Sequence, residues 1–146
     1  IPMSYENKVV TQHTFPAVSV SSAAGVRGIS RLPGKRYCRI LDIQTCVTTA
    51  VVATSTPPKL SFGDGSDADK FALQTAAVDT AAIGACRNIR DADGRIAAYA
   101  TSGKGYIDWD SDGAAGALTT MVITPVVGTG GSVAGAYDAN VILEWW

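Results

Sequence analysis

Apolar and polar side chains alternate along several short stretches of the chain, as they do in strands that bury one face. In residues 137–146 every second side chain, ending at Trp145, is apolar or aromatic, which predicts a strand. Trp145 and Trp146 fall on opposite faces of that strand, so we expect one ring in the core and the other on the surface. Residues 9–15 alternate in the same way, and His13, the only histidine, is expected to be a hydrogen-bonded sheet residue.

The longest β signal covers residues 36–52 and exceeds the length of an ordinary strand. We therefore expect a bulge or break within it, near residues 45–49. Five apolar side chains share one parity in this segment and are predicted to point the same way: Tyr37, Leu41, Ile43, Val47 and Val51. This pattern predicts a central core strand.

Shorter strands are expected at 17–22, 59–62, 95–100, 106–109 and 118–127. Residues 102–105 read Ser-Gly-Lys-Gly, a turn signal that predicts a hairpin between the strands on either side of it. The Ala-rich stretch 71–86 is left open: it is a short helix, or else a loop or an edge strand.

The composition supports a protein built from strands. Val, Ile and Thr together number 38 against 6 Leu, and residues branched at Cβ pack well on a pleated surface. We predict an all-β fold, an antiparallel β-sandwich or jelly roll of roughly eight strands with at most one short helix. At 146 residues we expect residues 1–8 to form an extended arm and residues 9–146 a single domain.

Charge is distributed unevenly along the chain. The net charge of −1 gives no case for a nucleic-acid partner, and no apolar run is long enough to predict a membrane span. Up to Phe62 there are seven basic and two acidic residues, whereas from Gly63 onward there are five basic and eleven acidic ones. Two interpretations stay open: the two regions attract other copies or a charged scaffold, or both are solvated loops.

The chain has three cysteines, whereas a framework of disulfides requires an even number. Cys38 and Cys46 fall on one predicted strand, where eight residues separate their Cα atoms by about 27 Å, too far for a disulfide. We expect reduced, partly buried thiols, as in a protein made in a reducing cytoplasm.

Residues 108–113 read Asp-Trp-Asp-Ser-Asp-Gly and match the first six positions of a calcium-binding loop. The oxygens of Asp108, Asp110 and Asp112 are candidate Ca²⁺ ligands, because alternating carboxylates can converge on one hard cation. Position twelve of such a loop should be Glu, but Thr119 stands there. An acidic hairpin turn is the alternative.

No other segment carries a chemical signature. Nucleophile elbows, phosphate loops and zinc-ligand spacings are absent, so we expect no catalytic residue and no cofactor besides Ca²⁺. Three tryptophans leave one alternative open, a sugar-stacking platform in a carbohydrate- or receptor-binding module of a fibre or secreted enzyme: Trp109, Trp145 and Trp146.

Two stretches together resemble a known type of protein. Residues 62–71, Phe-Gly-Asp-Gly-Ser-Asp-Ala-Asp-Lys-Phe, follow a strand and precede the Ala-rich segment, and the closing strand ends in Val141-Ile-Leu-Glu-Trp-Trp146. The combination resembles small β-sandwich head decoration (cement) and auxiliary structural proteins of tailed double-stranded DNA bacteriophage virions. The resemblance implies a non-enzymatic protein that binds the capsid surface, often as a trimer. It carries over no functional residues.

We therefore expect a capsid decoration protein located on the virion, with the major capsid protein and copies of itself as partners. Its contacts are expected from the N-terminal arm and the basic stretch, and the candidate interface residues are Tyr5, Lys8, Arg27, Arg31, Lys35 and Arg36.

Overall fold

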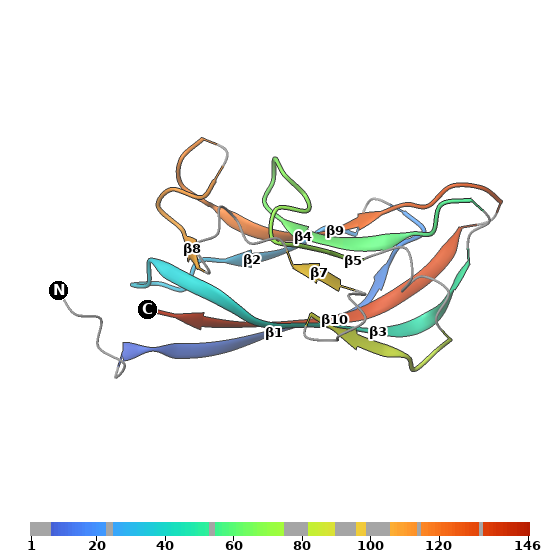
Figure 1. The fold of residues 1–146 in the computed structure, drawn as a ribbon, viewed down its shortest axis with the longest axis horizontal. Coiled ribbons are helices and arrows are strands. Elements are labelled where there is room, and N and C mark those ends of the chain that lie inside the picture. The colour runs from blue at the N-terminus through green and yellow to red at the C-terminus, as the bar shows by residue number, and fades with distance from the viewer. Residues whose placement is uncertain are drawn as a thin grey trace.

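The computed structural model is a β-sandwich of two antiparallel sheets (Figure 1). It describes residues 7–22, 25–52, 55–74, 82–89, 96–98, 106–113, 115–131 and 133–146, with backbone alone for 96–98. The described residues form ten strands and no α-helix, which confirms the predicted all-β sandwich. No helix in this part of the chain is long and apolar enough to cross a membrane.

Each sheet has five strands, and we call them sheet A and sheet B. Sheet A has the order β1-β10-β3-β6. Strand β8 also belongs to it and pairs with the first two residues of β3, whereas β6 pairs with the middle of β3. Its strands are β1 (Val9–Ser19), β10 (Ala134–Trp145), β3 (Tyr37–Val52), β6 (Cys86–Asn88) and β8 (Ile107–Asp108). Sheet B has the order β2 (Arg27–Ser30), β9 (Thr120–Val126), β4 (Lys59–Gly63), β5 (Ala72–Gln74) and β7 (Ile96–Ala98).

The two sheets lie face to face and enclose one hydrophobic core (Figure 1). Side chains alternate along β10 as the sequence predicts, and Trp145 is fully buried while Trp146 is only partly buried. The Trp145 ring packs on the Trp109 ring with centroids 5.3 Å apart, so two large aromatic side chains fill the core near one end. Such burial is the main force that holds the sheets together.

His13 belongs to a short hydrogen-bonded chain at the edge of this core. The indole Nε1–H of Trp145 donates to Thr11 Oγ1 over 2.7 Å, and Thr11 Oγ1 lies 2.9 Å from His13 Nε2. Partial burial lowers the pKa of His13. The predicted role of a hydrogen-bonded sheet residue is confirmed.

Strand β3 contains the expected bulge and further irregularities. Its pairing with β10 shifts between Val47 and Thr49, inside the predicted interval, between Thr49 and Val52, and again between Ile40 and Asp42, where the second bulge lies. The second bulge reverses which side chains point inward, because an extra residue changes the parity of the strand. Cys38 is therefore buried and Tyr37 lies only half-buried, contrary to the alternation expected from the sequence.

The predicted hairpin between 95–100 and 106–109 is wrong. Strand β7 pairs with β5 in sheet B, whereas β8 pairs with β3 in sheet A, so the two strands belong to different layers. Of the Ala-rich stretch, residues 72–74 form β5 and 86–88 form β6. Its centre, residues 75–81, lies outside the described residues.

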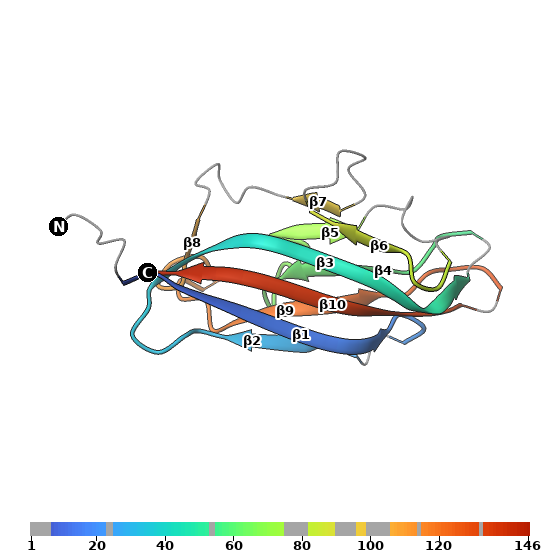
Figure 2. The ribbon, with the colours of Figure 1, turned by 90° about the horizontal axis from the view of Figure 1, so that it is seen from below.

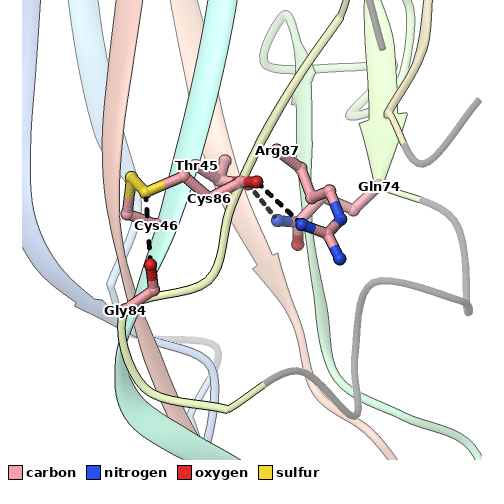
Figure 3. Close-up of a disulfide and its surroundings, with 6 residues drawn as sticks. All are labelled: Thr45, Cys46, Gln74, Gly84, Cys86 and Arg87. Atoms are coloured by element: carbon pink, nitrogen blue, oxygen red, sulfur yellow. Dashed lines mark hydrogen bonds between the residues drawn. A yellow bond between two sulfur atoms is a disulfide. The ribbon is translucent and has the colours of Figure 1, made fainter. Parts of the chain in front are cut away.

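Cys46 and Cys86 form a disulfide, which corrects the expectation of three reduced thiols. The two residues are directly opposed on β3 and β6 with Cα atoms 4.1 Å apart, although 40 residues separate them in the sequence (Figure 3). Cys38 is the free cysteine and is buried, as expected. Burial raises the pKa of its thiol to about 11, so it stays protonated.

A buried glutamine joins the two sheets beside this disulfide (Figure 3). Gln74 of β5 is fully buried; its Nε2 donates to Thr45 Oγ1 of β3 over 2.9 Å, and its Oε1 accepts from the Leu60 N–H over 2.7 Å. A hydrogen bond between the sheets has a preferred direction, so Gln74 adds a directional contact to the apolar packing between sheet A and sheet B.

We predict that Cys46→Ser lowers the free energy of unfolding by about 4 kcal/mol, the chain-entropy value for a disulfide that closes a 40-residue separation. Denaturant unfolding with and without a reducing agent measures the effect. The reducing agent should destabilise the natural chain and leave the Cys46→Ser variant unchanged. Equal stability of the two proteins under oxidising conditions would contradict a formed disulfide.

We predict that Gln74→Leu costs about 2–4 kcal/mol, because it leaves the Leu60 N–H and the Thr45 hydroxyl buried without a partner. Adding Thr45→Val removes one of these two groups and should restore part of the loss. A thermodynamic cycle from denaturant unfolding of the four proteins tests this. Additive losses in the double variant would show that the bond between the sheets does not matter.

Candidate interaction site

We call the end of the sandwich where β1 begins and β10 ends the terminal end (Figure 1). Charged and aromatic side chains gather there. The loops 31–36, 64–71, 109–113 and 115–119 lie at this end, because the strands β2, β4 and β8 run toward it. Four of the six predicted interface residues come together here: Lys8, Arg31, Lys35 and Arg36.

Arg36 and Asp108 form the central ion pair of this end. The guanidinium donates from Nε to Asp108 Oδ1 and from Nη2 to Asp108 Oδ2, both over 3.0 Å. This two-pronged hydrogen bond lowers the pKa of Asp108 to about 2, and the same bond raises the pKa of Arg36. Paired in this way, Asp108 orients Arg36 and stays ionised at any physiological pH.

Asp110 extends the pair into a network. Its carboxylate lies 2.7 Å from Arg31 Nη1 and 3.1 Å from Arg36 Nε, so one acidic side chain bridges two arginines. Arg31 also donates from Nε to the Lys35 carbonyl oxygen, and Lys35 Nζ donates to the Asn7 carbonyl oxygen. These bonds join the start of β1, the β2–β3 loop and the loop after β8.

The sequence 108–113 that matches a calcium loop folds here as a tight turn. Asp112 Oδ2 accepts from the Asp108 N–H over 2.6 Å, and Asp108 Oδ1 accepts from the Asp110 N–H over 3.0 Å. Gly113 is required because a Cβ at this position would lie 2.2 Å from the Ala117 carbonyl oxygen.

The three candidate calcium ligands therefore have other partners: arginine side chains for Asp108 and Asp110, and a backbone amide for Asp112. Among the described residues, no group of three or more His, Cys, Asp or Glu side chains is placed to hold a metal ion. Calcium binding stays a prediction, and the alternative of an acidic hairpin turn describes the geometry of residues 108–113.

A second acidic loop stands beside the first. Asp64 is buried, and although burial opposes its ionisation, the N–H groups of Asp67 and Ser66 and the ammonium of Lys70 together lower its pKa. Lys70 Nζ lies 3.0 Å from Asp64 Oδ2 and also donates to the Asp112 carbonyl oxygen. One lysine thus ties the β4–β5 loop to the turn after β8.

The third ion-paired group lies on the outer face of sheet A. Glu144 Oε1 is 3.2 Å from both Lys8 Nζ and Arg39 Nε, and the hydrogen bond from Lys8 lowers the pKa of Glu144. Two of the acidic side chains lie beneath arginines: Glu144 and Asp108 are only 14% and 12% exposed, whereas Arg39 and Arg36 are each 49% exposed. Asp110 is 46% exposed and its partner Arg31 38%, so a partner approaching this end meets both guanidinium and carboxylate groups.

Three aromatic rings pack next to these charges. The Tyr37 ring stacks on Trp146 with centroids 6.0 Å apart, and Tyr106 meets both rings edge-on at 5.4 and 6.3 Å. Lys8 Nζ lies 5.3 Å from the Trp146 ring centre, and the Arg36 guanidinium lies 5.1 Å from that of Tyr37. We call these three residues the aromatic cluster. Tyr37 and Tyr106 could not be recognised as part of this group from the sequence. A bulge in β3 turns Tyr37 toward the surface, and Tyr106 lies far from Tyr37 along the chain.

The sugar platform of three tryptophans is not formed. Trp109 and Trp145 are fully buried, and the Trp109 Nε1–H donates to Cys38 Sγ inside the core. Only Trp146 of the three reaches the surface, where Tyr37 and Lys8 lie against its ring. The carbohydrate-binding alternative thereby loses the stacking surface on which it depended.

The remaining candidate interface residues lie elsewhere. Arg27 is the first residue of β2, at the opposite end of that strand from the Arg31 network. Tyr5, like the rest of residues 1–6 of the predicted arm, lies outside the described residues. The uneven charge along the chain is partly explained by pairing within the molecule, since Arg31 and Arg36 from the basic part bind Asp108 and Asp110 from the acidic part.

Comparison with known proteins adds little to this geometry. No protein-family model matches the chain, and no curated protein matches it. Among solved structures, the chain is similar to "Cyanophage Pam1 capsid asymmetric unit", with 15% sequence identity and a TM-score of 0.47. The similarity covers 94% of this chain and 84% of that one. A likeness at this level assigns no function.

We predict that the Arg36–Asp108 pair makes the protein acid-sensitive. The pKa of Asp108 is about 2 in the folded protein against an ordinary value of 3.8, so the pair stabilises the fold above pH 4 and this contribution is lost as the pH falls from 4 to 2. Asp108→Asn should be less stable at neutral pH and should lose less stability over that interval.

Urea unfolding at a series of pH values measures this difference. Asp69→Asn is the control, because it removes one carboxylate from an exposed loop without touching Arg36. If the stability curves of the natural chain and the Asp108→Asn variant run parallel between pH 4 and pH 2, the Arg36–Asp108 pair does not cause the loss of stability in acid.

Proposed function

We propose that this chain is a non-enzymatic structural protein of a bacteriophage virion that decorates the outside of the capsid. The terminal end is the surface that binds, and the major capsid protein is its partner. The observation that carries the proposal is the combination at this end of exposed arginines with the aromatic cluster, on a rigid two-sheet scaffold. The sequence resemblance to decoration proteins supports the same assignment.

The composition of this end suits a protein partner. Tyr, Trp and Arg are the residues that most often carry binding energy in protein interfaces. The rings are already packed on one another, so little side-chain freedom is lost when a partner covers them. The arginines are held by carboxylates beneath them, which leaves donors pre-oriented for acidic groups of a partner.

Weak contacts of this kind suffice on a capsid. A shell presents many identical sites in a fixed lattice, and a protein that engages more than one of them gains affinity through effective concentration. Decoration of a symmetric shell therefore requires a complementary surface and no chemical reaction.

Two measurements test the proposal on particles of a phage that encodes the chain. Mass spectrometry of purified virions should find the protein in a fixed ratio to the major capsid protein, and electron microscopy should place it outside the shell. Consistent absence from purified virions would refute the proposal.

Variants then test the binding surface on particles stripped of the protein. Arg36→Ala and Trp146→Ala should each reduce rebinding about tenfold or more, which is the usual effect of truncating an interface anchor. Arg27→Ala is the matched control, because it removes a cation away from the terminal end and should leave rebinding unchanged. Equal loss for all three variants would indicate a non-specific electrostatic attraction.

A further inference from the structure

The strand β1 forms one margin of sheet A and leaves a long main-chain edge open (Figure 2). It pairs with β10 alone, in continuous register from Val9 to Phe15. Among the described residues, no other segment bonds to the backbone of residues 9–15. Because the peptide groups of a strand point alternately to its two sides, about half of the N–H and C=O groups of these residues face outward, away from β10.

This edge lacks the protections that natural sheets use. Edge strands are usually short, or carry charges, prolines or bulges that prevent another strand from adding to them. The other edge strands in the described part of the chain, β2, β6, β7 and β8, have two to four residues each, whereas β1 has eleven. Residues 9–15 contain no Asp, Glu, Lys, Arg or Pro, and Pro16 and the bulge come only after Phe15. An open, uncharged edge of this length is a template for an extended polypeptide.

The inward face of the same strand is incompletely covered. Directly opposed residues of an antiparallel pair point the same way, so four side chains of β1 lie on the face that the buried residues of β10 occupy: Val9, Thr11, His13 and Phe15. None of these four is fully buried, and Val9 is 40% exposed. On this margin sheet B ends at β2, which has only four residues (Figure 2). A further strand beside β1 would cover this row with its own side chains.

A cation stands at the start of the open edge. Lys35 Nζ donates to the carbonyl oxygen of Asn7, two residues before β1 begins. Four other basic residues near this end each pair with a carboxylate: Lys8, Arg31, Arg36 and Arg39. In the described part of the chain, no carboxylate pairs with Lys35. An added segment is therefore favoured if it brings a carboxylate to this position.

We propose that the outer edge of β1 binds an extended segment of another protein, which adds antiparallel to residues 9–15 and places a carboxylate beside Lys35. Every pairing in sheet A is antiparallel. An antiparallel segment runs toward the terminal end, so the carboxylate stands near its C-terminal end, as an Asp or Glu side chain or as a free C-terminus. The side chains that cover Val9 and Phe15 are apolar.

The charge at this edge favours a different protein over a second copy of β1. Residues 7–19 of a second copy contain no carboxylate for Lys35. The proposal rests on the proposed function for the source of the segment, which is the capsid protein. It adds to the terminal end a second contact, made through main-chain hydrogen bonds.

A synthetic strand tests the edge directly. The probe is a peptide as long as residues 9–15, of alternating Thr and Val and ending in Glu, N-methylated at every second residue so that only one of its edges can pair. Hydrogen–deuterium exchange read by mass spectrometry should show uptake by residues 9–15 falling about threefold or more at short times when the probe saturates the protein, because the outward amides become bonded. The remaining strands should exchange as before.

A pair of cations tests the carboxylate. A probe ending in Gln should bind the natural chain about threefold more weakly than the probe ending in Glu, as expected for an exposed ion pair. Lys35→Gln should abolish this difference. Lys59→Gln is the matched control, because it removes a cation at the start of β4 in sheet B and should preserve the difference.

An inward charge tests the geometry. His13→Asp places a short carboxylate where the added strand would bury it, so the probe should bind about tenfold more weakly or worse. Thr49→Asp is the control, because it adds the same charge at an exposed position of β3, a strand with neighbours on both sides. Circular dichroism should show both variants folded; in His13→Asp, Thr11 keeps its bond to Trp145.

Exchange on purified virions identifies the occupant, because residues 9–15 should be protected there as they are by the probe. Unchanged exchange of residues 9–15 at saturating probe, or equal binding of the probe by His13→Asp and Thr49→Asp, would overturn the proposal. Protection in the purified protein alone, rising with its concentration, would overturn it in favour of a second copy. Virions that contain the protein with residues 9–15 unprotected would exclude the capsid segment. Binding of the probe by a protein absent from virions would support the edge and refute the proposed function alone.

Discussion

Burial of the inward face of β10 is the constraint on which the rest of the structure depends. This strand pairs with β1 on one side and β3 on the other over most of its length, so it occupies the centre of sheet A. Its inward side chains run from Tyr137 to Trp145 and are all buried. Because Trp145 packs on Trp109, the same burial positions the turn after β8 and, through it, the carboxylates that hold Arg31 and Arg36. The surface chemistry of the terminal end therefore depends on the core directly beneath it.

Features that depend on neighbouring residues could be predicted from the sequence. Alternation predicts β10 and the first half of β1, and the excessive length of residues 36–52 predicts the bulge near Thr49, because both follow from the geometry of an extended chain. The separate strand predicted at 17–22 is wrong, since β1 continues to Ser19 through a bulge between Phe15 and Val18. The bulge at Leu41 could not be predicted, since it depends on how β3 aligns with β10 rather than on its own sequence. That single extra residue decides that Cys38 enters the core and that Tyr37 joins the aromatic cluster.

Features that depend on pairing across the chain could not be predicted. The spacing of Cys38 and Cys46 correctly excludes a bond between them, but only the register of β3 with β6 brings Cys86 opposite Cys46. The match to a calcium loop considers carboxylates alone, whereas the partner of Asp108 is Arg36, 72 residues earlier. A local motif shows which chemical groups are present, but the topology of the strands determines which residues those groups contact.

Topology also explains why the two ends of the molecule differ. From β1 to β6 and from β8 to β10 successive strands run in opposite directions, so their connections alternate between the two ends, whereas β6, β7 and β8 all run toward the terminal end. The loops at the terminal end carry arginines and carboxylates, whereas the sequence between β1 and β2, β3 and β4, and β9 and β10 contains no charged residue, and the strands β2 and β4 that follow begin with Arg27 and Lys59. If the charged residues formed one continuous stretch of sequence, that stretch would pass through loops at both ends. The charged residues instead gather at one end because several separate loops that carry them lie there. The ion-paired residues of the terminal end are therefore brought together by the direction of the strands, although they come from distant parts of the sequence. Salt screens charged groups on a surface, so ionic strength reports how much this end contributes to any binding.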